Sequence, residues 1–176
     1  MFLFSGVGAA AGFVALDYFK DFDDEMRKVQ ARTQATEKDF KALTEQARQI
    51  GATTSFTAKD AASGMSVLST MGFSTGEIQQ SIEQFMNLER AAGMGDLAST
   101  ITMAASTMRA FGLDASESGR VVDVLAQTAL SSAQDINDLA ESMKNAGTGA
   151  ELTNTSIEEI SASLGVLANV GIRGSI

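Results

Sequence analysis

Apolar residues recur every three or four positions along most of this chain, which is the spacing of an amphipathic α-helix. The clearest stretch runs from residue 19 to residue 50, where eight of ten positions at these steps are apolar. The positions between them are largely charged or amide side chains, as a solvated face requires. We predict one long amphipathic helix over residues 17–50. We call its apolar stripe the seam, with Phe19, Phe22, Met26, Val29, Phe40, Leu43 and Ile50 as the proposed contact residues.

The seam fits two arrangements. Its repeat is close to the heptad of a coiled coil, so it could pair with another copy of the chain. It could equally lie across the core of its own domain. The pattern alone leaves both open.

A turn signal returns along the chain: Gly, then a bulky apolar residue, then a helix-capping residue. Glycine accepts the left-handed conformation that ends a helix, and the apolar residue folds back on the last turn. A Ser or Asp then caps the next helix, with a Glu three positions later completing a capping box. The three instances are Gly72-Phe73-Ser74 with Glu77, Gly112-Leu113-Asp114 with Glu117, and the shortened Gly171-Ile172.

About six shorter helices are predicted after residue 50. A further capping box is expected at Thr155 and Glu158, after a flexible turn over residues 145–155 that is rich in Gly, Thr and Asn. No stretch shows the strict alternation of a half-buried strand. The predicted fold is all-α: a long N-terminal amphipathic helix, then a compact module over residues 51–176 built as an array of helical hairpins. The expected helices cover approximately residues 57–71, 75–92, 97–111, 115–129, 136–146 and 157–167.

Residues 1–16 carry no charged side chain and are rich in Gly and Ala. We interpret them as an apolar helical lead-in buried against protein. A membrane-active segment and a signal peptide are the alternatives, but a membrane span needs about 20 apolar residues. A signal peptide should begin with Lys or Arg, and this segment does not.

Composition narrows the chemistry. The chain has no Pro, Cys, His or Trp, and its net charge is −9. It therefore lacks the commonest general base, the commonest transition-metal ligand and any thiolate. The acidic cluster at residues 21–25 lacks the spacing of a calcium loop, and an acidic body repels phosphate. We predict no catalytic, cofactor, metal or nucleic-acid site.

Eight blocks of sequence follow one another along the chain, beginning at Asp21, Leu43, Gly51, Met71, Ala110, Val122, Asp138 and Leu164. No block is decisive alone, but their order is specific. Together, from Asp21 to Ser175, they resemble the core of the phage tail tape measure protein family. The glycine- and alanine-rich segment before them resembles the lead-in of that family.

The resemblance implies structural work in virion assembly. Tape measure proteins are long helical proteins held inside the tail tube, and their length sets the tube's length. The expected partners are other copies of the chain, tail tube subunits, tail assembly chaperones and baseplate or tail-tip proteins. The expected locations are the virion tail and, during assembly, the host cytoplasm. Since the family core continues where this chain stops, we expect a fragment. The alternative function is a membrane-active segment that assists DNA passage through the host envelope, with residues 1–16 in contact with the membrane.

Overall fold

The computed structural model describes residues 7–93, 95–132 and 136–172, and within these ranges the side chains from residue 20 onward except those of residues 136, 137, 148 and 151. The described residues form eight α-helices and one short 3₁₀ turn, with no strand among them. This confirms the predicted all-α class. The helices are α1 (Val7–Thr33), α2 (Glu37–Thr53), α3 (Ala58–Thr70), α4 (Thr75–Ala92), α5 (Leu97–Ala110), α6 (Ser118–Ser131), α7 (Ile136–Thr153) and α8 (Ile157–Asn169), and the turn η1 (Ala115–Glu117) precedes α6.

The helices form four hairpins in sequence order: α1–α2, α3–α4, α5–α6 and α7–α8. In every hairpin a residue with positive φ follows the first helix, and a capping residue lies two positions later. That residue caps the second helix directly, except in the third hairpin, where it caps the turn η1 that leads into α6. The left-handed residue reverses the chain, and the cap restarts it. The capping residues recur at intervals of 38, 40 and 42 residues: Thr36, Ser74, Asp114 and Ser156.

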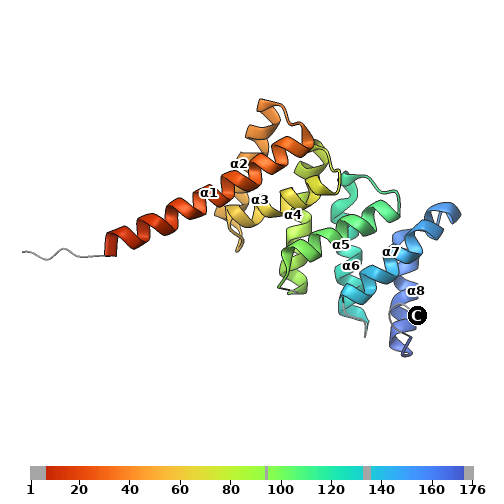
Figure 1. The fold of residues 1–176 in the computed structure, drawn as a ribbon. Helices are drawn as coiled ribbons and strands as arrows, with labels where there is room; N and C mark the ends of the chain where they lie inside the picture. Colours follow the sequence, from red (N-terminus) through yellow and green to blue (C-terminus); the bar gives the residue numbers. More distant parts are fainter. Residues whose placement is uncertain (1–6, 94, 133–135, 173–176) are drawn as a thin grey trace, which may run out of the picture.

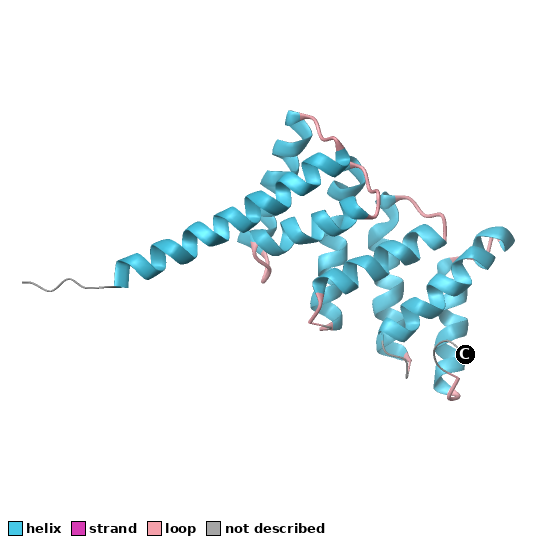
Figure 2. Cartoon of the chain, viewed as in Figure 1, coloured by secondary structure: helices cyan, strands magenta, loops and turns pink. Residues whose placement is uncertain are grey.

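The hairpins stand side by side in a row (Figures 1 and 2). The first helices pack on one another in the order α1, α3, α5, α7, and the second helices in the order α2, α4, α6, α8. Each second helix also packs on the first helix of the next hairpin. Among the described residues, extensive packing joins only helices one or two places apart in the chain. This is the architecture of a short helical solenoid, in which each unit contacts its neighbours.

The structure corrects the single helix expected over residues 17–50. The chain reverses at Gln34, whose φ is 52°, and the Ala35 N–H donates to the Gln30 carbonyl at 3.2 Å. Thr36 then caps α2 by accepting from the Asp39 N–H. The three-and-four spacing continues across this turn because both arms of the hairpin bury an apolar stripe, and a spacing rule cannot detect the reversal between them.

The flexible turn expected over residues 145–155 is also wrong, because α7 continues to Thr153. The reversal occurs at Asn154, with φ 53°. The capping box lies one residue later than predicted: Ser156 caps α8 with Glu159 as its partner. The remaining helices after residue 50 lie where the sequence placed them, to within a few residues.

Small residues allow the closest approach between first helices. A Cβ built on Gly147 of α7 would lie 2.7 Å from the Ala110 Cβ and 2.9 Å from the Ala110 carbonyl carbon and oxygen. Gly147 is buried against the end of α5. The α5–α7 spacing therefore depends on this position having no side chain.

Candidate functional site

The glycines of the turn signal all adopt the left-handed conformation. The φ angles of Gly72, Gly112 and Gly171 are 81°, 64° and 93°. After each glycine, the next N–H donates to the carbonyl five positions earlier: Phe73 to Leu68 at 3.1 Å, Leu113 to Met108 at 3.0 Å and Ile172 to Leu167 at 2.9 Å. This pair of features is the Schellman motif. The turn signal thus sets the chain reversal in two hairpins and ends α8.

The capping box at the start of α4 is complete. The Ser74 N–H donates to Glu77 Oε2 at 2.7 Å, and the Glu77 N–H donates to Ser74 Oγ at 3.3 Å. These bonds to the Ser74 backbone and hydroxyl hold the pKa of the Glu77 carboxyl below its usual value. At the corresponding turn, the Asp114 N–H donates to Glu117 Oε2 at 3.3 Å. Both Glu residues therefore support the start of a second helix.

The seam residues face the protein's own core wherever their side chains are described. Phe22, Met26, Val29, Leu43 and Ile50 are each at most 5% exposed and belong to one apolar cluster. Phe40 is partly buried against the same cluster. The side chain of Phe19 lies outside the described residues. The seam thus joins the first hairpin to its neighbours, and that use of the apolar surface leaves little of it for a second copy.

Polar contacts link equivalent helices of successive hairpins, and the sequence analysis did not identify them. The Arg120 guanidinium of α6 donates to both oxygens of Glu158 in α8, at 2.6 and 2.7 Å. Arg120 lowers the pKa of the Glu158 carboxyl, and in turn the pKa of Arg120 is raised. Lys59 of α3 donates to Asp21 of α1 at 2.6 Å. Partners that are 38 residues apart match the length of one hairpin, which is the only sequence signal that could have suggested them.

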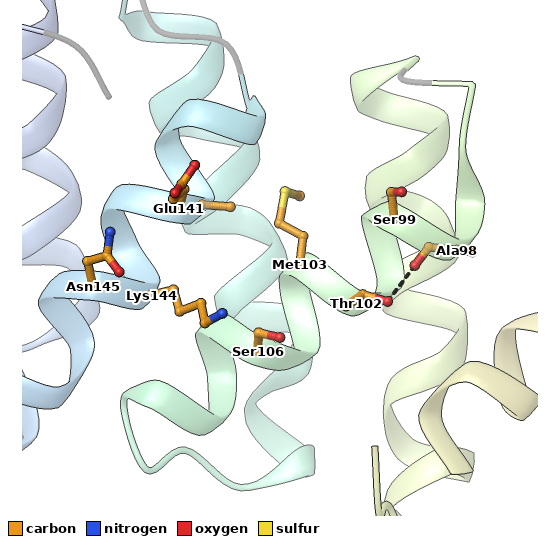
Figure 3. A pocket seen from close by; sticks show the side chains of 9 residues that line it. Ala98, Ser99, Thr102, Met103, Ser106, Glu141, Lys144 and Asn145 are labelled. Carbon is orange, nitrogen blue, oxygen red and sulfur yellow. Dashed lines mark hydrogen bonds between the residues drawn. The ribbon is translucent and has the colours of Figure 1, made fainter. Parts of the chain in front are cut away.

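An open groove lies between α5 and α7 on the first-helix side of the array (Figure 3). Its volume is about 510 Å³, and small side chains line most of it. Lys144 and Glu141 of α7 are its charged lining residues. The lining side chains offer hydroxyls, an amide, a thioether, the Glu141 carboxylate and the Lys144 ammonium group. Its lining residues are Ala98, Ser99, Thr102, Met103, Ser106, Ala140, Glu141, Lys144 and Asn145.

The part of the chain that the structure describes holds no group of three or more acidic side chains placed to bind a metal ion. None of its helices has both the length and the apolar content to span a membrane. Residues 1–6 of the proposed lead-in lie outside the described residues, as do the side chains of residues 7–16.

Comparison with known proteins identifies the family. The profile of a family described as phage-related minor tail protein matches residues 44–176, from the middle of α2 to the end of the chain. A tape measure protein of Pneumococcus phage Dp-1 is 39% identical over 155 residues, which cover 88% of this chain. The chain belongs to the phage tail tape measure family. A probable tape measure protein of Escherichia phage P2 is 28% identical over 135 residues, 77% of the chain.

This tape measure chain is short beside its relatives. The matched regions span 13% of the Dp-1 protein and 16% of the P2 protein. No solved structure matches the chain significantly. Membership of the family connects the chain with the phage tail.

Proposed function

We propose that this region is a compact assembly module of a tape measure protein that sets tail tube length and is held in the tube lumen. The similarity to the Dp-1 tape measure protein, over 88% of the chain, carries the proposal. The proposed partners are tail tube subunits, tail assembly chaperones, baseplate or tail-tip proteins and other copies of the chain. Assembly takes place in the host cytoplasm, and the product stays in the virion tail.

The hairpin array supports separate roles for this region and for the part of the longer protein that sets length. A straight α-helix advances about 1.5 Å per residue, so a helical ruler gains length in proportion to its sequence. In this region the chain reverses direction within each hairpin, at Gln34, Gly72, Gly112 and Asn154. Residues added here widen or lengthen a row of short helices instead of extending a rod. The region therefore organises contacts, and length is set elsewhere in the protein.

A deletion in a phage that encodes this protein tests whether this region contributes to tail length. Removing one whole hairpin unit, residues 97–136, deletes about 40 residues that would contribute about 60 Å to a straight helix. We expect either tails of unchanged length or failure of tail assembly, measured by negative-stain electron microscopy. An in-frame deletion of equal size in a long uninterrupted helical segment of the same protein is the control, and it should shorten the tail. Tails shortened by about 60 Å on removing residues 97–136 would contradict the module role.

Cross-linking mass spectrometry of purified virions tests the location. Lys41 of α2 and Lys144 of α7 lie on exposed parts of the array. We expect cross-links from these lysines to the tail tube subunit in intact particles. A chain that is absent from washed tails, or that links only to proteins outside the tube, would remove the lumen from the proposal.

A further inference from the structure

Strongly exposed large apolar side chains are confined to one end of the described array. They lie on α6, α7 and α8 and just after α8, whereas the described parts of α1 to α5 carry none. Among the described side chains, strongly exposed large apolar residues therefore occur only toward the C-terminal end of the row. The exposed residues are Leu130, Leu152, Val166, Leu167, Val170 and Ile172.

The repeat register shows which of these residues occupy core positions. The second helices can be aligned on their capping residues, Thr36, Ser74, Asp114 and Ser156. Eleven and fourteen positions after the cap, the first three hairpins bury both side chains, with at most 8% exposed. In α8 the same positions are 41% and 71% exposed. The aligned pairs are Ala47 and Ile50, Phe85 and Leu88, Leu125 and Thr128, and Leu167 and Val170.

The difference follows from the neighbours of each helix. In the first three hairpins, the second helix packs on the first helix of the hairpin that follows, which is α3, α5 or α7. The described chain supplies no such helix after α8. Leu167 and Val170 occupy in α8 the positions that the earlier second helices bury, and Val166 extends the same apolar surface at 64% exposed.

We propose that Val166, Leu167 and Val170 form the docking surface for a fifth helical hairpin, supplied by the same polypeptide after residue 176. The three equivalent interfaces in this chain are all made between consecutive hairpins of one polypeptide. Gly171 ends α8 in the left-handed conformation, so the chain leaves this helix in a turn. The relatives, of which the chain spans 13% and 16%, are long enough to contain further units.

A second copy fits this surface less well. Head-to-tail stacking would place the apolar C-terminal end against the first hairpin, whose described side chains include no strongly exposed large apolar residue. The inference does not use the proposed role in the tail, so it stands or falls separately from that role.

The test compares residues 1–176 with the product of the complete reading frame that encodes them. Hydrogen exchange of the α8 backbone amides should be slower in the longer product by about tenfold or more, because burying even one such side chain stabilises a local structure by that factor. The double variant Leu167→Ala/Val170→Ala should remove most of that protection in the longer product and leave residues 1–176 nearly unchanged. Leu152→Ala is the matched control: this exposed side chain lies outside the register and should have little effect in either protein.

Three results would overturn the inference. The first is a reading frame that stops at residue 176. The second is α8 exchange that is equally fast in both proteins. The third is a concentration-dependent dimer of the longer product, seen by analytical ultracentrifugation and abolished by the double variant, which would assign the surface to a second copy.

Discussion

The contact at Gly147 gives a sharp prediction, because two glycines two positions apart in α7 should respond to alanine in opposite directions. At Gly147 a new Cβ would meet the Ala110 Cβ at 2.7 Å and its carbonyl carbon and oxygen at 2.9 Å. Backbone atoms cannot rotate away, so α7 must shift from α5. At Gly149 a Cβ would meet nothing within 4 Å, and the position is exposed.

The expected changes in the free energy of unfolding follow from two opposing contributions. Overpacking of a close contact costs about 1–3 kcal/mol. Alanine in place of glycine inside a helix gains about 0.8–1 kcal/mol. We therefore expect Gly147→Ala to lower the free energy of unfolding by about 1–2 kcal/mol, because the obstructing atoms are backbone. Gly149→Ala has only the favourable term and should raise the free energy of unfolding by about 0.5–1 kcal/mol.

Urea unfolding followed by circular dichroism at the helix band measures both variants. The expected midpoint shift for Gly147→Ala is about 0.5–1 M downward. Ala110→Gly in the same background removes the nearest atom but not the carbonyl group, so it should recover part of the loss. If Gly147→Ala stabilised the protein as Gly149→Ala does, the close packing of α7 on α5 would be wrong.

Three more predictions concern the seam, the turns and the caps. Leu43 is fully buried, so Leu43→Ala should lower the free energy of unfolding by about 2–5 kcal/mol. The molecular mass measured by light scattering should stay unchanged, and a fall in mass would show instead that the seam joins separate copies. Gly72→Ala should lower the free energy of unfolding by about 1–2 kcal/mol, because the φ of Gly72 is 81°. Gly76 lies in open space, so Gly76→Ala should raise the stability of the protein. Equal effects of the two substitutions in thermal melts would contradict the left-handed turn. The pKa of Glu77 is lowered by its bonds to Ser74, so its stabilising effect is complete above its ordinary value of 4.5 and lost as the pH falls through the lowered pKa. Glu77→Gln should reduce the fall in melting temperature between about pH 5 and about pH 3. An unchanged dependence of melting temperature on pH would show that the capping box contributes nothing to stability.

Local chemistry made part of this fold predictable. At Gly72 and Ser74 the reversal and the restart are set by the residues themselves: a glycine free to take positive φ and a hydroxyl able to cap. The number and order of the helices after residue 50 follow from the same signals. The seam was predicted as a stripe, and its burial in the protein's own core required the structure.

The errors occurred where other residues perform the same conformational role. Gln34 takes the left-handed conformation with a side chain that seldom favours it, and Asn154 takes it as a residue that, after glycine, adopts it most readily, so no glycine marked either reversal. Gly147 posed the reverse problem, because a glycine that permits close helix packing looks like one in a flexible turn. The pairing of Arg120 with Glu158 depends on how hairpins stack, which no local window of sequence contains.

The row of hairpins also fixes how the region would respond to tension. When each unit is held only by its neighbours, a chain pulled from its ends yields one unit at a time, from a terminus inward. The unfolding of each unit of approximately 40 residues would release about 140 Å of extended chain. Single-molecule stretching should therefore record a series of evenly spaced force peaks. In the tube location proposed above, this unfolding would lengthen the protein in steps of one hairpin.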